Sequence, residues 1–135
     1  MSINKLDDMD FESKYHFSFE NLIVYQKAIL FGEKINKLVE TFPKKEIFRL
    51  SSQFSRAADS IAANISEGSA SSDANFNRYL KMAWDSSHEC VTWNTKAYLR
   101  NYITKEQFEN NRAALTEIGK MISSLSKKTK NRAVN

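Results

Sequence analysis

Apolar side chains recur at steps of three and four residues through four long stretches of this sequence, and few turn-forming residues interrupt them. There are only three glycines and one proline in 135 residues. Such steps place side chains on one face of a helix, and scarce glycine and proline favour a few long helices over many short strands. We therefore expect an all-α chain with helices over residues 21–40, 46–67, 73–100 and 105–126.

Local signals mark several of the expected helix ends. Gly68 follows the second stretch, where we predict a left-handed cap. Ser71 or Ser72 can cap the third helix through its hydroxyl. Thr104 and Gln107 match a capping box at the start of the fourth helix. Four amphipathic helices with short connections predict an antiparallel up-down-up-down four-helix bundle.

The length of the chain fits one packed core, and charge divides the chain into three parts. Residues 1–18 are acidic and lack a sustained period, so we expect a flexible N-terminal arm. We assign residues 19–126 to the bundle and residues 127–135 to a basic C-terminal tail. The first 20 residues hold two lysines against five carboxylates, a net charge of −3, so that the overall +4 leaves +7 on the remaining chain. A basic body of this kind attracts nucleic acid.

The stretch over residues 50–68 has an apolar face and a polar flank. The polar flank carries long side chains beside small alanines and serines, and the helix over 73–100 has a matching flank. We interpret these residues as a structural network between helices or subunits, because ion-pair networks imitate active sites. The predicted network consists of Gln53, Arg56, Ser60, Asn64, Glu67, Ser86 and Glu89.

The first helix is apolar around more of its circumference than one core contact requires, and the third has a second flank of its own. This surplus indicates a second burial surface, most simply against another subunit. Scattered surface hydrophobic residues are the alternative, since they are common. The predicted oligomer face consists of Val24, Phe31, Leu38, Met82 and Trp93.

Residues suited to catalysis or metal binding are few and poorly spaced. The single cysteine, Cys90, falls on the core face of its helix, and His16 and His88 provide no set of metal ligands. No glycine-rich phosphate loop is present. We expect a protein that is not an enzyme and needs no cofactor or metal. Lacking a signal-peptide run and a membrane-spanning window, the sequence fits the cytoplasm.

Several motifs together resemble one known family. They are ENLIVYQKA at 20–28, FP at 42–43, LSSQ at 50–53, RAADSI at 56–61, NISEG at 64–68 and FNRYLKMA at 76–83. The chain is similar to the intervening-sequence proteins, which are encoded within insertions in bacterial large-subunit ribosomal RNA genes. The resemblance implies a four-helix protomer that assembles into a ring, typically a homopentamer. A related branch, the accessory protein of diversity-generating retroelements, implies a basic binder of nucleic acid.

The chain departs from the family pattern after residue 68. Relatives often continue with basic residues there, whereas this chain has Ser69, Ala70, Ser71 and Ser72. We therefore look for phosphate-binding groups elsewhere on the basic body. The candidate nucleic-acid-binding residues are Lys44, Lys45, Arg49, Arg78, Lys81, Lys127, Lys128, Lys130 and Arg132.

The function we expect is electrostatic binding of RNA or DNA by a homo-oligomeric helical bundle, with little reading of sequence. The alternative is a scaffold that binds a protein partner and never meets nucleic acid. The acidic arm and the serine-rich loop favour that alternative.

Overall fold

The computed structural model describes residues 13–134, with side chains through Arg132. It contains four long helices and two short 3-10 turns, and no strand occurs in that range. The all-α prediction is therefore confirmed. The elements are η2 (Ser18–Asn21), α1 (Ile23–Val39), η3 (Lys44–Glu46), α2 (Leu50–Ser69), α3 (Asp73–Leu99) and α4 (Lys105–Val134).

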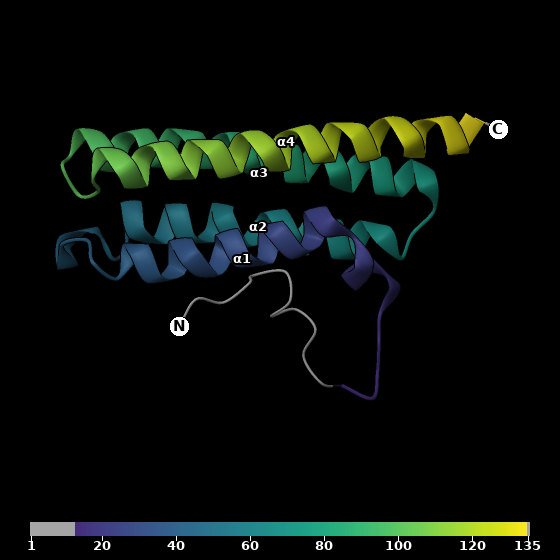
Figure 1. The fold of residues 1–135 in the computed structure, drawn as a ribbon, viewed down its shortest axis with the longest axis horizontal. Coiled ribbons are helices and arrows are strands. Elements are labelled where there is room, and N and C mark those ends of the chain that lie inside the picture. Colours follow the sequence, from purple (N-terminus) through teal and green to yellow (C-terminus); the bar gives the residue numbers. More distant parts are fainter. Residues whose placement is uncertain (1–12, 135) are drawn as a thin grey trace.

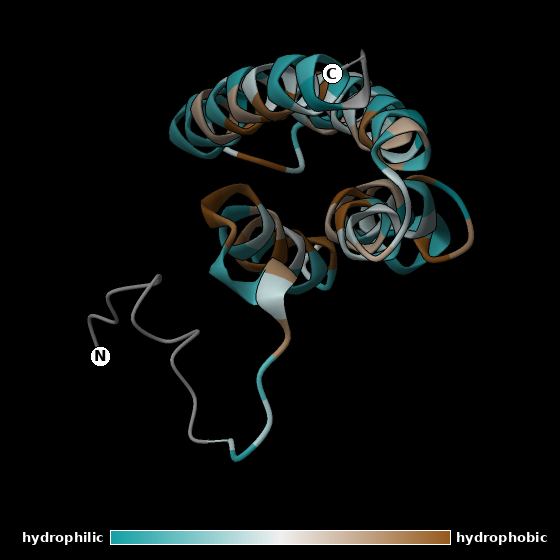
Figure 2. Ribbon diagram, turned by 90° about the vertical axis from the view of Figure 1, so that its right-hand side faces the viewer, coloured by the Kyte–Doolittle hydropathy of each residue, from teal (hydrophilic) through white to brown (hydrophobic). Residues whose placement is uncertain are grey.

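Consecutive long helices lie side by side, and each reverses the direction of the one before it (Figure 1). Helices α1 and α2 form one layer, and α3 and α4 form the other (Figures 1 and 2). The layers pack most extensively where α2 meets α3, whereas α1 and α4 touch only sparsely. Between the layers lies one core, whose largest fully buried apolar side chains include Ile35, Phe54, Ile61, Leu80 and Ile118.

The last helix is longer than the sequence indicated. We expected it to end at Ser126, but α4 continues to Val134, so the basic residues after 126 are helical. Two contacts attach this extension to the bundle. Thr129 is fully buried, and the Arg132 guanidinium lies 3.5 Å from a carboxylate oxygen of Asp73 at the start of α3. Of the predicted flexible arm, residues 1–12 lie outside the described residues.

Two of the three predicted caps are confirmed. The Ser72 hydroxyl accepts a hydrogen bond from the backbone N–H of Asn75 (3.3 Å). Thr104 and Gln107 form the reciprocal capping box, with distances of 2.8 and 3.0 Å. The left-handed cap at Gly68 was wrong, because this glycine lies inside α2 and no glycine in the chain has a positive φ.

Gly68 serves close helix packing instead of a turn. A Cβ atom at this position would lie 2.5 Å from the Cβ of Tyr79 and 3.0 Å from the ring of Phe76, both on α3. Only a residue without a side chain lets the end of α2 approach α3 this closely. Further along the same contact, the hydroxyl of Ser60 donates a hydrogen bond to that of Ser86 (3.0 Å).

A buried pair of amides joins α3 to α4. Asn94 and Asn111 are both fully buried. The Asn111 amide donates to the Asn94 carbonyl oxygen (2.8 Å), and the Asn94 amide donates to the backbone carbonyl of Phe108 (3.1 Å). The Asn111 carbonyl oxygen has no partner among the described residues. The amide donors of this pair reach their acceptors only when the two helices are in register, because an unpaired donor in the core is costly. This pair therefore specifies how α4 lies along α3.

The two connections at one end of the bundle are tied together through Glu46. Its side chain is buried, its carboxylate accepts a hydrogen bond from the Tyr102 hydroxyl (2.6 Å), and the Arg100 guanidinium lies 3.0 Å away. The Tyr102 hydrogen bond and the positive charge of Arg100 lower the pKa of Glu46 below its ordinary value, although burial acts in the opposite direction. The ionised carboxylate thus clamps the α1–α2 connection to the α3–α4 connection.

We expect Gly68→Ala to lower the free energy of unfolding by about 1–2 kcal/mol, because overpacking against Tyr79 outweighs the better helix propensity of alanine. Gly119→Ala is the matched control, since its Cβ would lie 3.4 Å from Trp84, an ordinary contact. This control should gain up to about 1 kcal/mol. Urea unfolding of both variants measures the difference, and equal stabilisation by the two would contradict the close-packing role of Gly68.

The clamp at Glu46 predicts an acid-dependent stability. Because the folded pKa of Glu46 is lowered, its contribution is fully present above the ordinary value of 4.5 and is lost as pH falls through the folded value. Thermal midpoints measured from pH 3 to 7 should therefore fall less steeply on acidification for Glu46→Gln than for the unmodified chain. Glu109→Gln is the control, because Glu109 is an exposed member of an i,i+4 pair with Lys105. If the thermal midpoints of Glu46→Gln and of the unmodified chain fell equally steeply on acidification, the proposed role of Glu46 would be contradicted.

Candidate nucleic-acid interface

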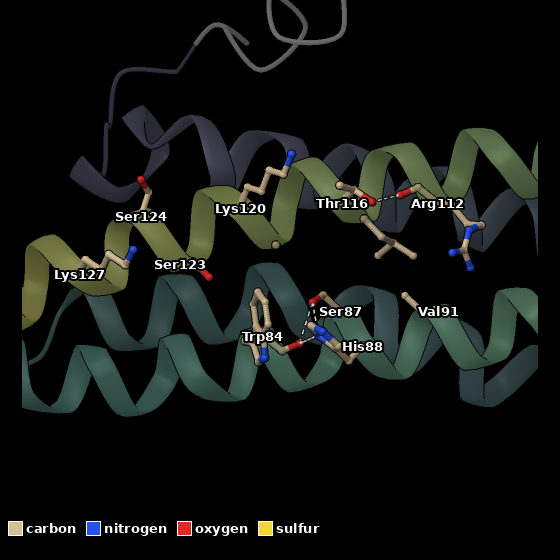
Figure 3. A pocket seen from close by; sticks show the side chains of 12 residues that line it. Trp84, Ser87, His88, Val91, Arg112, Thr116, Lys120, Ser123, Ser124 and Lys127 are labelled. Atoms are coloured by element: carbon tan, nitrogen blue, oxygen red, sulfur yellow. Dashed lines mark hydrogen bonds between the residues drawn. The ribbon is translucent and has the colours of Figure 1, made fainter.

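A surface groove runs between α3 and α4. It consists of two hollows of about 410 and 390 Å³, and both are lined by Trp84, Ser123 and Lys127, so they adjoin. Figure 3 shows the larger hollow, with Trp84 and His88 on α3 facing Ser123 and Lys127 on α4. We call this surface the α3/α4 groove.

The lining of the α3/α4 groove is positively charged. No aspartate or glutamate belongs to it. One of its cations, Lys81, is already paired with Asp85 on the same helix. The other cations form no ion pair within residues 13–132, so their charges are available to an anion. These unpaired cations are Arg112, Lys120, Lys127 and Lys130.

The spacing of these residues along α4 explains why they share one side. Arg112, Lys120 and Lys127 are separated by eight and seven residues, which keeps the three side chains within about 80° of one another around the helix. The acidic residue Glu117 lies on another side of α4, where it pairs with Lys27 of α1 at 2.6 Å. Helix α4 thus presents unpaired cations along the α3/α4 groove and places a carboxylate against α1.

The structure divides the nine predicted nucleic-acid-binding residues between two ends of the bundle (Figure 1). Those that line the α3/α4 groove are Lys81, Lys127 and Lys130. Those on α3 and α4 outside its lining are Arg78, Lys128 and Arg132, of which Arg132 is engaged with Asp73. Those in or beside the α1–α2 connection, near the opposite end, are Lys44, Lys45 and Arg49.

The basic residues at this opposite end surround a carboxylate. A hollow of about 440 Å³ is lined there by Lys45, Glu46, Arg49, Arg100 and Tyr102. The buried charge of Glu46 offsets part of the positive charge around it, and Arg100 already pairs with it. An incoming phosphate therefore meets more uncompensated charge in the α3/α4 groove than at this end.

Four residues that line the α3/α4 groove were not among the predicted binding residues: Arg112, Lys120, Trp84 and His88. The near-heptad spacing of Arg112, Lys120 and Lys127 was a usable signal. The contribution of α3 was not visible, because nothing in the sequence states which face of α4 borders Trp84. His88 is exposed, and its ring lies 4.2 Å from that of Trp84.

The predicted network is brought together in part. Ser60 and Ser86 bond across α2 and α3, and the Asn64 amide donates to the carbonyl of Ser60 (2.8 Å). The remaining members are exposed, and none forms an ion pair or side-chain hydrogen bond within the described part of the chain. These members are Gln53, Arg56, Glu67 and Glu89. A pairing of these residues with a second subunit stays a prediction.

The predicted oligomer face needs correction at two positions. Val24 and Phe31 are 4% and 3% exposed and belong to the core of the protomer, so they offer no surface to another subunit. Their stripe faces inward because α1 borders both α2 and α4, which widens its buried side. Leu38 and Trp93 are partly buried against the same core, and only Met82 is largely exposed.

The single thiol of the chain, Cys90, is buried in the core of the bundle. Burial, followed by the nearby charges of Glu89 and Asp59, raises the pKa of the Cys90 thiol to about 12, so this group stays protonated at neutral pH. No three residues of the histidine, cysteine and carboxylate types gather into a possible metal site within the described range. None of the helices there has the length and apolar character needed to cross a membrane.

The fold and these motifs have counterparts among known proteins. The family model of the 23S rRNA-intervening sequence protein matches residues 20–124. The chain is also similar to a crystal structure of a protein with unknown function from the S23 ribosomal protein family of Bacteroides thetaiotaomicron, with 32% identity and a TM-score of 0.73. That match covers 78% of this chain and 96% of the other. No curated protein matches. The predicted resemblance is confirmed, and the chain belongs to the family of 23S rRNA-intervening sequence proteins.

Proposed function

We propose that this protein is a non-enzymatic, homo-oligomeric helical bundle that binds RNA or DNA electrostatically through the α3/α4 groove. The observation that carries the proposal is the set of four unpaired cations, Arg112, Lys120, Lys127 and Lys130, in a lining without carboxylates. Lysine and arginine side chains that neutralise phosphates release condensed counterions, which supplies most of the affinity in binding that does not read sequence.

Self-association is supported by exposed apolar side chains at the end of the bundle that holds the α1–α2 connection. Phe48 is 93% exposed, Leu99 is 72% exposed and Ile47 is 51% exposed. The Glu46–Arg100 contact holds the α1–α2 connection, which carries Ile47 and Phe48, close to the end of α3, which carries Leu99. Large exposed apolar side chains that gather in one region mark interaction sites. We propose this end as a contact between subunits of a ring, typically of five, as the family resemblance implies.

A protein-binding scaffold is the alternative function. The same exposed Phe48 and Leu99 favour it, because an apolar end can contact a different protein as well as a second copy. Such a scaffold would use this end and leave the α3/α4 groove empty. For either function, we propose that the protein is located in the cytoplasm.

The double variant Lys120→Gln/Lys127→Gln should weaken binding of a fluorescein-labelled 20-nucleotide single strand roughly 10- to 50-fold at about 0.1 M salt, because two phosphate contacts are lost. The slope of log K against log salt should become shallower by about 1.4. Fluorescence anisotropy at several salt concentrations measures both quantities.

The matched control is Lys44→Gln/Lys45→Gln, which removes the same charge at the opposite end of the bundle. Its effect on affinity should be much smaller. Equal losses for the two double variants would show that net charge matters and the α3/α4 groove does not. A chain that binds no strand at low salt would refute the nucleic-acid function and leave the scaffold.

Self-association predicts that Phe48→Asp converts the assembly to monomers, because a charge at the apolar end cannot be buried between subunits. Since Phe48 is almost fully exposed in the protomer, its replacement should leave the thermal midpoint nearly unchanged. Light scattering on the purified protein gives the mass. Ile23→Asp is the comparison, because Ile23 is an exposed apolar residue at the start of α1, away from the α1–α2 connection, and its replacement should leave the mass unaltered. A monomeric unmodified chain would contradict this proposal.

A further inference from the structure

We infer that the α3/α4 groove holds an unpaired base of a single-stranded nucleic acid against the indole of Trp84. This inference rests on the proposed function and adds the class of nucleic acid and the residue that recognises it. The electrostatic proposal by itself makes no distinction between single strands and duplexes, since both carry phosphates.

Trp84 occupies the junction of the groove. It lines both hollows, and its indole is only partly buried, packed on one side against the core. Figure 3 shows the side chain extending from α3 toward α4. The larger hollow, of about 410 Å³, lies within the range of pockets that accept small molecules. An aromatic ring on the floor of a cationic groove is the arrangement by which proteins stack single-stranded bases.

Gly119 keeps space open beside this ring. A Cβ atom on Gly119 would approach the indole at 3.4 and 3.9 Å, so any longer side chain there would cover the ring. A glycine in the middle of a helix is otherwise unfavourable. Its position beside Trp84 therefore leaves the indole uncovered by an α4 side chain at this point.

Three polar side chains lie beside the ring, and one of them, Ser123, has no internal partner among the described residues. Ser123 lines both hollows, and its hydroxyl makes no hydrogen bond among the described residues, which leaves it free for the edge of a base. His88 covers one part of the indole at a ring distance of 4.2 Å, and its Nδ1 lies 3.0 Å from the backbone carbonyl of Trp84. Ser87 is already engaged, because its hydroxyl donates to the same carbonyl at 2.7 Å.

The cations lie on both sides of Trp84 along the groove. Lys120 and Arg112 belong to the larger hollow, whereas Lys130 belongs to the smaller one, and Lys127 is shared. A strand that follows the groove would place phosphates near these residues on either side of the base at Trp84. In a duplex the bases are paired and stacked on each other, so their faces cannot reach an indole recessed between two helices.

The test uses Trp84 as its own reporter. Trp84 and Trp93 are the two tryptophans of the chain, so Trp93→Phe leaves Trp84 as the single fluorophore. The indole N–H of Trp93 is buried without a partner, so phenylalanine at this position strands no hydrogen-bonding group. The probes are an oligo(dT) strand, an abasic strand of equal length and charge, and a duplex of equal length.

We expect oligo(dT) to quench Trp84 and to bind at least 5-fold more tightly than the abasic strand, as a stacked base predicts. The abasic strand and the duplex should bind without quenching. Equal affinity for oligo(dT) and the abasic strand, with no quenching, would overturn the inference while the electrostatic function survived. If none of the three probes bound, both the base-stacking inference and the proposed nucleic-acid function would be refuted. Quenching by the mononucleotide dTMP at lower concentration than by the strand would overturn the assignment to a strand.

A blocking variant tests the site without altering charge or Trp84. Ser123→Phe places a ring in the groove and should reduce the affinity for oligo(dT) more than the affinity for the abasic strand, so that the difference between the two strands disappears. Ala113→Phe is the matched control, because Ala113 is exposed on α4 and does not line the groove. Equal losses for both strands in Ser123→Phe, or an equal effect of Ala113→Phe, would overturn the inference.

Discussion

The close contact between α2 and α3 is the constraint on which the rest of the structure depends. Gly68 has no side chain, so the end of α2 can approach Tyr79 on α3 at a distance that no other residue permits. The hydroxyls of Ser60 and Ser86 meet across the same contact. Because α2 occupies one side of α3, α4 must pack on another, and the groove between α3 and α4 follows from that arrangement.

Helix α4 contacts α3 and α1 through different kinds of side chain. Toward α3 it buries Asn111, whose amide reaches Asn94 and sets the register of the pair. Toward α1 it presents Glu117, which pairs with Lys27. Four cations of α4 line the α3/α4 groove. They stay unpaired there because no carboxylate belongs to its lining. Because the carboxylate and the unpaired cations lie on different sides of α4, the positive charge is concentrated in the α3/α4 groove, which is the candidate site.

Elements whose signals are local agreed closely with the structure. The capping residues Ser72, Thr104 and Gln107 act through atoms three residues apart, so nearby sequence is sufficient to predict them. Predictions that needed a distant partner were less successful. Gly68 resembled a turn glycine because its neighbour across the helix contact, Tyr79, is eleven residues away. Phe31 resembled a second surface because the packing of α1 against α4 was unknown.

The sequence by itself determined that this chain forms long amphipathic helices, where most of them begin, and which family it belongs to, because periodicity, caps and motifs are properties of contiguous residues. The tertiary structure alone decided which faces meet. Arg112, Lys120 and Lys127 are recognisable in the sequence as one helical face, but only the packing of α4 beside α3 puts that face next to Trp84. Contacts between helices depend on shape as well as on pattern, and shape emerges only when the side chains are packed.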